Sequence, residues 1–339
     1  MAKAVTRQVE FDILKGIGML MVIIGHSIHV WPLYEFFYCV HMPLFFLVSG
    51  YFFSLKGNWG GVIVKNAKQL ILPYFAVSAI ICILFLLFQQ HGETLLRETL
   101  LGTSLSNEHN IVLGPVWFFL ALFWCRLIYR FLAQRTHTSQ RTLLIFSITL
   151  VLVLINRFKP IFQLPYEVTQ GMVSMFYYHI GAVLKERKAV SREHKATQKV
   201  AVVSISIITL LCTLVYYKIN GTNMNLSALQ FPLFPIDMIN AVLLVVSLYI
   251  IVEWLVKRGW CARLNEFLAW FGESSMVIYF IHCVEYHFTI PFMSSLSAET
   301  DVAAIRYSII LCNPFVQVII CIVGLYVYNK IKTIIVQHQ

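Results

Sequence analysis

The sequence predicts an all-α fold, a polytopic membrane helix bundle of about ten transmembrane helices with the N and C termini in the cytoplasm. Composition, long apolar runs and the placement of basic residues support this prediction. Of the 339 residues, 59% are hydrophobic and only 12% are charged, whereas soluble proteins carry about 25% charged residues. So few charges cannot cover a water-facing surface, which excludes an ordinary soluble enzyme.

The apolar residues form runs long enough to cross a bilayer, which takes about 20 mostly apolar residues in a helix. The ten predicted spans lie near 13–31, 36–55, 70–89, 112–132, 142–156, 167–184, 200–217, 233–256, 267–290 and 305–328. Two long polar connections, 90–111 and 218–232, fall on the side opposite the termini. Because the runs continue along the whole chain, we expect residues 1–339 to form a single integral-membrane domain.

Basic residues give the orientation of the predicted bundle. Of the 26 Lys and Arg residues, 21 fall on the side of the N-terminus, and the other side keeps Arg97, Arg157, Lys159, Lys218 and Arg306. The positive-inside rule therefore puts both termini in the cytoplasm. The net charge of +10 comes from short clusters between spans, which argues against a nucleic-acid partner.

The first span carries ionisable residues, each of which costs at least ~2.5 kcal/mol inside a membrane. Lys15 and His26 are separated by about three full helical turns and about 16 Å of rise, so they project from one face. Lys15 is expected near the cytoplasmic surface and His26 deeper, with His29 continuing the face. The alternative is structural, with Lys15 extending to the interface and His26 as a hydrogen-bonded packing residue.

The second span places another histidine opposite His26. Only Trp31–Tyr34 or so separates the two spans, so they are expected to be adjacent and antiparallel. Reflection about this turn puts His41 at the depth of His26, with the two imidazoles facing each other. Ser49 and Tyr51 follow on the same span, either in close helix packing or in a cavity wall.

A metal site is not expected. His282, Glu285 and His287 lack the H-E-x-x-H spacing that aligns two histidine ligands on one helix face. At i and i+3, His282 and Glu285 are expected to form a hydrogen-bonded pair. The eight cysteines include no CxxC pair, so neither a disulfide framework nor a zinc knuckle is predicted.

The first two spans resemble a known family. The segment from Phe11 to Gly18, with Gly25-His26-Ser27 and the run Val40–Phe53, resembles the membrane-bound acyltransferase family 3, in its fucose 4-O-acetylase-related branch. That family is marked by Arg or Lys, ten residues and then His, which Lys15 and His26 match. Weaker matches at 114–119 and 278–282 extend the resemblance over essentially the whole chain.

The resemblance implies transfer of an acyl group, usually acetyl from cytoplasmic acetyl-CoA, to a hydroxyl of a glycan or lipid-linked sugar. The expected partners are acyl-CoA, this acceptor and the lipid bilayer, and no tightly bound cofactor is expected. The expected location is the cytoplasmic (inner) membrane, and a homo-oligomer is compatible with the resemblance. Many members carry an Arg-x-x-Arg motif near the third helix, for which Lys65 and Lys68 are the nearest counterparts. Many also carry a fused hydrolase-like domain, which was not found in this sequence.

Acyl transfer to an alcohol assigns roles to these residues. Imidazole has a pKa of about 6.5, which suits a general base, so His26 is the candidate base. His41 is expected to orient the acceptor, to donate to the oxyanion or to share the base role. The expected donor-binding residues are Lys15, Lys65 and Lys68, through charge on the CoA phosphates. The expected acceptor wall comprises Ser49, Tyr51, Trp117 and His282.

Several alternatives stay open at this point. Acyl-His26 and acyl-Ser49 intermediates are both compatible with the sequence, which also leaves open the acceptor, the acyl chain and the side of the membrane that is modified. The rival function is a secondary transporter of a small polar solute, because ionisable residues in spans also mark substrate paths. Against it, no inverted repeat and no paired broken helices are visible.

Overall fold

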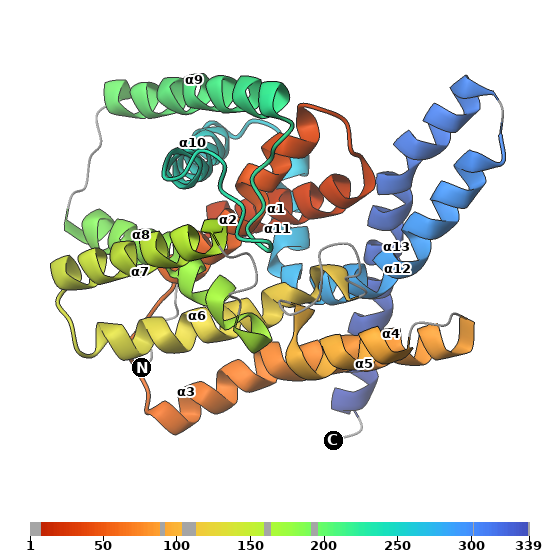
Figure 1. The fold of residues 1–339 in the computed structure, drawn as a ribbon, viewed down its shortest axis with the longest axis horizontal. Helices are drawn as coiled ribbons and strands as arrows, with labels where there is room; N and C mark the ends of the chain where they lie inside the picture. Colours follow the sequence, from red (N-terminus) through yellow and green to blue (C-terminus); the bar gives the residue numbers. More distant parts are fainter. Residues whose placement is uncertain are drawn as a thin grey trace. The chain divides into compact units, whose positions relative to one another are not determined.

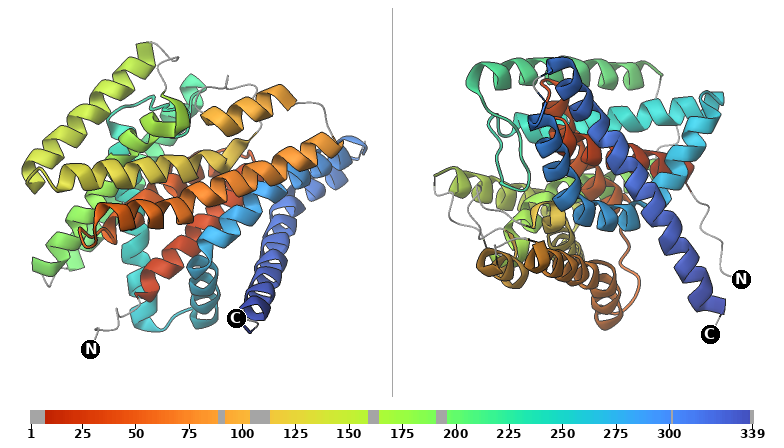
Figure 2. Two further views of the ribbon diagram at one scale, coloured as in Figure 1. Left: turned by 90° about the horizontal axis from the view of Figure 1, so that it is seen from below. Right: turned by 90° about the vertical axis from the view of Figure 1, so that its right-hand side faces the viewer.

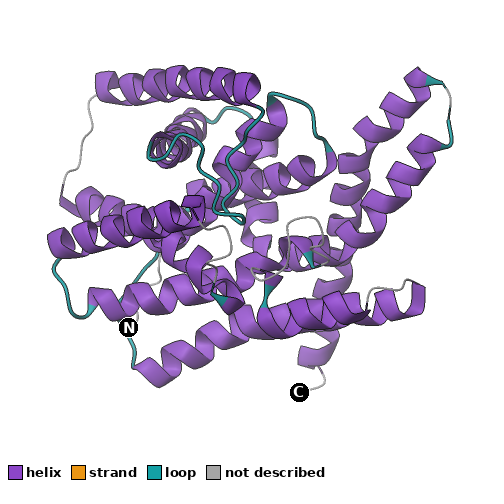
Figure 3. Ribbon diagram, viewed as in Figure 1, coloured by secondary structure: helices purple, strands orange, loops and turns teal. Residues whose placement is uncertain are grey.

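The computed structural model describes residues 8–88, 92–103, 113–158, 164–190, 196–300 and 302–337. Throughout these ranges the regular structure is helical, and β-type pairing is limited to one isolated bridge between Asn225 and Gln230. Figure 3 shows this helical content and the loops that join the helices. The predicted all-α class is confirmed.

The order of the helices along the chain can be followed by colour in Figure 1. The first half contains α1 (Val9–Ser27), α2 (Leu33–Tyr51), α3 (Trp59–Asn66), the π-helical turn η1 (Ala67–Ile71), α4 (Leu72–Phe88), α5 (Gly92–Leu101), the 3-10 turn η3 (Gly114–Val116), α6 (Trp117–Ala133) and α7 (Thr138–Phe158). The second half contains η4 (Pro165–Glu167), α8 (Val168–Val190), α9 (Ala196–Asn220), α10 (Ile236–Arg258), α11 (Ala262–Glu273), α12 (Ser275–Ala298) and α13 (Ala303–Gln337).

Eight segments of the described chain are long and apolar enough to cross a membrane. They are Leu33–Tyr51, Trp59–Leu87, Gly114–Ala133, Thr138–Phe158, Thr197–Asn220, Ile236–Arg258, Ser275–Ala298 and Ala303–Ile334. The other two expected spans form helices α1 and α8, of 19 and 23 residues, which are not among these eight; α1 carries the charged residues Glu10, Asp12 and Lys15. The chain is thus a multi-pass membrane protein, while the number ten and the orientation stay predictions.

The predicted span 267–290 is wrong as a single helix. Ser274 leaves the helical backbone (φ −90°, ψ 10°), so that α11 ends at Glu273 and α12 begins at Ser275. With 12 residues, α11 is about 18 Å long, too short for a hydrocarbon core of about 30 Å. The membrane candidate is α12, whose 24 residues begin inside the predicted range and extend beyond it.

Other predicted boundaries also need correction. The first helix ends at Ser27 rather than at residue 31, and the third span begins at Trp59 because α3, η1 and α4 are contiguous. The connection 90–111 contains helix α5, in which the Glu98 carbonyl accepts a hydrogen bond from Tyr74 Oη at 2.8 Å. Residues 90, 91 and 104–111 of this connection lie outside the described ranges.

By its internal contacts the chain divides into two compact units, which are described separately. Unit 1 comprises Met1–Leu44, His194–Tyr216 and Ile239–Gln339, and unit 2 comprises Phe45–Glu193 and Tyr217–Met238. Helix α2 contributes to both units. The expectation of one domain over residues 1–339 therefore stays a prediction.

In unit 1, α1 packs against α11, and α12 packs beside α13; Figure 2 shows α12 and α13 as a helical hairpin. Glycine allows the first contact, because a Cβ at Gly16 would clash with the Leu268 carbonyl and one at Gly272 with the Asp12 carbonyl. Small residues let membrane helices approach this closely. This crossing fixes the helix that carries Lys15 and His26.

Glycine also sets the helix contacts of unit 2. A Cβ at Gly50 of α2 would meet the Tyr178 carbonyl, and one at Gly181 of α8 would meet the Leu47 carbonyl. The chain leaving α2 is held by Arg130 of α6, whose guanidinium donates to the backbone carbonyls of residues 54–57. Unit 2 therefore fixes the C-terminal end of α2, which carries Ser49 and Tyr51.

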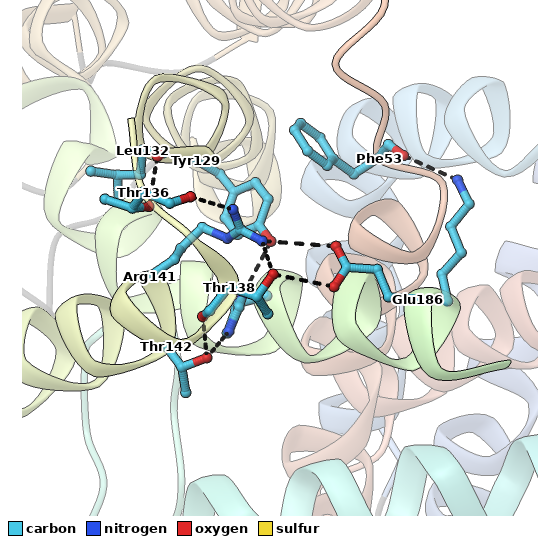
Figure 4. Close-up of polar contacts among 10 residues, drawn as sticks. Phe53, Tyr129, Leu132, Thr136, Thr138, Arg141, Thr142 and Glu186 are labelled. Atoms are coloured by element: carbon cyan, nitrogen blue, oxygen red, sulfur yellow. Dashed lines mark hydrogen bonds and ion pairs between the residues drawn. The ribbon is translucent and has the colours of Figure 1, made fainter. Parts of the chain in front are cut away.

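A polar cluster ties α6, α7 and α8 together at the α6–α7 connection (Figure 4). His179 lies 3.0 Å from Tyr129 Oη through Nδ1 and 2.7 Å from Thr142 Oγ1 through Nε2. Arg141 donates to the Thr136 carbonyl at 3.3 Å and lies 3.8 Å from the Glu186 carboxylate. With both ring nitrogens bonded, His179 is a packing histidine.

Candidate active site

Helices α1 and α12 of unit 1 bring two histidines into direct contact. His26 Nδ1 lies 3.0 Å from His282 Nε2, and the two rings are nearly parallel with centroids 5.3 Å apart. The sequence predicted a pair with Glu285 and a place in the acceptor wall for His282, but no contact with His26. The structure makes His282 a hydrogen-bonding partner of the candidate base, which its weak Tyr-x-x-His motif did not indicate.

Glu285 continues this contact on the far side of His282. Its Oε1 lies 2.7 Å from His282 Nδ1, three residues apart on α12, which confirms the predicted pair. His282 is fully buried and Glu285 nearly so. Glu285 Oε2 is buried with no hydrogen-bond partner among the described residues, and Cys321 Sγ of α13 lies within 4.8 Å of the pair's ligand atoms.

His41 faces His26 as predicted. The two ring centroids are 6.4 Å apart and the ring planes are nearly perpendicular. His41 Nδ1 donates to the Phe37 carbonyl one turn earlier in α2. Tyr38 lies edge-on to both histidines, at centroid distances of 6.3 Å from His26 and 5.1 Å from His41. Tyr286 of α12 contacts His26 from another side, at 5.4 Å.

Exposure differs sharply among the three histidines. His282 and His41 are buried, whereas His26 lies deep in the unit but keeps part of its surface accessible. Its Nδ1 is engaged by His282, and no hydrogen bond to Nε2 is recorded in the described part of the chain. The arrangement therefore offers one imidazole edge to a reactant while the other edge is held.

A polar row on α13 borders the same site. Asn313, Gln317 and Cys321 recur every four residues, so they share one helix face. Gln317 donates to Asn313 Oδ1 at 3.2 Å, and its amide lies 2.9 Å from the hydroxyl of Ser27, the residue after His26. Sequence reasoning missed this row, although two amides four residues apart in an apolar run were a usable signal.

Two expectations for the first helix need revision or refinement. His29 does not continue the face of Lys15 and His26, because α1 ends at Ser27 and His29 lies in the exposed connection against Tyr34. Lys15 Nζ lies 2.8 Å from Asp12 Oδ1. Part of its positive charge is thus already balanced within α1.

The remaining predicted residues belong to unit 2. Ser49 Oγ accepts a hydrogen bond of 3.0 Å from Arg126 Nε. Tyr51 and Trp117 are largely buried, near the end of α2 and at the start of α6. The structure thus gives Ser49 a cationic partner, and the roles of all three in acceptor binding stay predictions.

Lys65 and Lys68 lie exposed on α3 and η1, and neither forms an ion pair with another described residue. Arg126 of α6 reaches the same stretch, donating to Asn66 Oδ1 at 3.2 Å and lying 3.5 Å from Gln69 Oε1. Its described partners are uncharged. Sequence reasoning counted Arg126 only as an orientation signal, so this cluster of three cations was missed.

The family comparison decides the class of this protein. The family model described as "Acyltransferase domain" matches residues 8–327 and so includes every candidate site residue. The chain belongs to acyltransferase family 3. With the helices described above, it is a multi-pass membrane protein of this family. This membership favours an enzyme over the secondary transporter.

Two curated relatives share part of the sequence. The nodulation protein NolL of Mesorhizobium japonicum is 32% identical over 149 residues, which are 39% of this chain and 38% of the relative. NolL of Sinorhizobium fredii is 32% identical over 94 residues, 24% of this chain and 26% of the relative. The matched stretch is thus well under half of each relative. No solved structure matches.

Proposed function

We propose that this protein transfers an acyl group, acetyl by preference, from cytoplasmic acyl-CoA to a hydroxyl of a cell-envelope glycan or lipid-linked sugar, in the cytoplasmic membrane. The observation that carries the proposal is the contact of partly exposed His26 with a buried histidine, in a chain of the acyltransferase family. The preference for acetyl and for a glycan acceptor rests on the resemblance of the first two helices to fucose 4-O-acetylase-related proteins.

The reaction needs one base and then one acid. His26 takes the proton of the acceptor hydroxyl as its oxygen attacks the thioester carbonyl carbon, a C–O bond forms, and negative charge develops on the carbonyl oxygen. When this intermediate collapses, the C–S bond breaks and the protonated His26 gives its proton to the leaving sulfur. The products are the O-acyl ester and free CoA thiol. A positioned acid–base group contributes about 10²–10⁴-fold to such a step.

His41 has a narrower role than the sequence allowed. A backbone carbonyl only accepts hydrogen bonds, so the contact with Phe37 requires a proton on His41 Nδ1. In the neutral ring Nε2 then carries a lone pair. Neutral His41 can therefore accept a hydrogen bond from the acceptor hydroxyl, and we assign it to orienting the acceptor rather than to stabilising the oxyanion.

Donor binding is assigned to Lys65, Lys68 and Arg126. The CoA moiety carries several phosphate charges, and these three cations have no carboxylate partner in the described chain. Guanidinium matches phosphate in a two-pronged geometry, whereas ammonium acts as a point charge. Lys15, paired with Asp12, is assigned a secondary role in the same step.

The proposal is tested with the whole protein in membranes. Envelope glycans from cells with and without the gene are compared by mass spectrometry for O-acyl groups, and membranes are incubated with acetyl-CoA labelled in the acetyl group. We expect acyl-bearing glycans only when the gene is present, and label transfer from acetyl-CoA. Identical glycans in the two strains, with no gene-dependent transfer of label, would overturn the proposed function.

A further inference from the structure

Three side chains of unit 1 form a continuous hydrogen-bonded row that ends at His26. Glu285 Oε1 lies 2.7 Å from His282 Nδ1, and His282 Nε2 lies 3.0 Å from His26 Nδ1. The row runs from a buried carboxylate through a buried imidazole to the imidazole of partly exposed His26. The acid–base step of His26 uses neither Glu285 nor His282 as a proton donor or acceptor to the substrate.

The positions of the protons in this row follow from its two ends. Oε1 of the Glu285 carboxylate has only lone pairs to present to His282, and the row is described for this ionised form. His282 Nδ1 therefore carries the proton of the first contact. In a neutral ring Nε2 then has a lone pair, and the proton of the second contact must belong to His26 Nδ1.

We propose that Glu285 and His282 are positioning residues that hold neutral His26 with its proton on Nδ1, so that Nε2 presents the lone pair that accepts the acceptor's proton. This inference rests on the proposed function of His26 as base. A free imidazole populates both tautomers, and only one leaves Nε2 basic. The row selects that one.

Burial makes the selection strong. His282 is fully buried and Glu285 is 6% exposed, so water cannot replace a lost contact. Reversing the tautomers would put two lone pairs, or two N–H groups, against each other in one contact. Leaving a buried polar group unpaired costs about 1–3 kcal/mol, which corresponds to about 5–150-fold in the tautomer ratio.

The same row serves the charged intermediate. When His26 Nε2 takes the proton, the imidazolium keeps Nδ1–H directed at His282 Nε2, and His282 keeps its own proton directed at Glu285. No proton has to move along the row. The Glu285 carboxylate is linked to His26 through two successive hydrogen bonds. In this buried environment its negative charge favours the positive charge on His26.

The test reads the tautomer directly, by ¹⁵N NMR of histidine in the purified whole protein, because a nitrogen with and without a proton resonates in different regions. The His26 signals are assigned by their loss in His26→Gln. In the parent protein we expect a protonated Nδ1 and an unprotonated Nε2 at neutral pH. The opposite pattern in the parent would overturn the inference.

Variants of the two positioning residues extend the test. In Glu285→Gln the amide can donate to His282 Nδ1 and reverse the row. We expect a shift of His26 toward the Nε2–H form and a fall in kcat of up to about 10⁴-fold, the effect of replacing a triad carboxylate by its amide, with the KM for acyl-CoA unchanged. His282→Gln offers a carbonyl to His26 and an N–H to Glu285, so it should keep the parental tautomer, whereas His282→Leu should not.

The control is His287→Gln on the same helix, because His287 Nδ1 bonds the Cys283 carbonyl and lies outside the row. It should leave the tautomer of His26 and kcat unchanged. Parental tautomer and kcat in Glu285→Gln would overturn the positioning role even if His26 proves essential. If the tautomer responds as expected but His26→Gln stays fully active, the row is correct and the proposed base is wrong.

Discussion

The assignment of Arg126 to donor binding can be tested with one substitution. Arg126→Gln removes a guanidinium that donates to Ser49 at 3.0 Å and to Asn66 at 3.2 Å, and whose described partners are all uncharged. A hydrogen bond to a charged group is worth about 1.5–3 kcal/mol. If the guanidinium also binds a CoA phosphate, its loss weakens acetyl-CoA binding by about 10–150-fold.

The assay is calorimetric titration of acetyl-CoA into detergent-purified protein, with the thermal unfolding midpoint recorded for each variant. Arg126→Lys keeps the charge but not the two-pronged geometry, so its affinity should fall between parent and Arg126→Gln. Arg135→Gln makes the same change in charge at an exposed position near the end of α6 and should bind acetyl-CoA normally. Parental affinity in a folded Arg126→Gln would refute the assignment.

Three further predictions follow from the helix contacts and the charge pattern. Gly272→Val should destabilise the α1–α11 crossing by about 1–3 kcal/mol and lower the thermal unfolding midpoint. Gly60→Ala, where a Cβ meets nothing within 4 Å, should leave the midpoint unchanged. Equal midpoints for the two variants would contradict the described crossing. His179→Phe should lower the free energy of unfolding by about 1–3 kcal/mol, because Tyr129 and Thr142 each lose a hydrogen bond, and should leave acetyl-CoA affinity unchanged. A parental unfolding midpoint would show that the polar cluster of Figure 4 adds little to stability. A reporter fused after Gln339 should lie in the cytoplasm, and an external reporter would rule out an even number of spans with a cytoplasmic N-terminus.

The sequence predicted those features that depend on local pattern. Apolar runs predicted the helices, and the short turn after the first span predicted that His26 and His41 face each other, because two helices joined by a few residues have little freedom. The i, i+3 spacing likewise predicted the pair of His282 and Glu285. In each case the residues concerned lie close in the chain.

Contacts between distant segments could not be predicted in the same way. His26 and His282 are 256 residues apart, and which helix faces α1 is decided by packing such as the approach of Gly272 to the Asp12 carbonyl. Arg126 was missed for a related reason, since its partners lie on α2, α3 and η1. The break at Ser274 was missed because the polar residues of the run 267–290, Glu273 among them, were interpreted as part of one unusually polar span.

The central claim is that His26 is the base of an acyl transfer. The most direct measurement is the single-turnover rate of label transfer from bound acetyl-CoA in His26→Ala, compared with the parent and His287→Gln under saturating donor. The account predicts normal insertion, normal acetyl-CoA affinity and a rate lower by about 10²–10⁴-fold in His26→Ala alone. Transfer at the parental rate would contradict it, and failure of His26→Ala to insert would instead indicate a packing histidine.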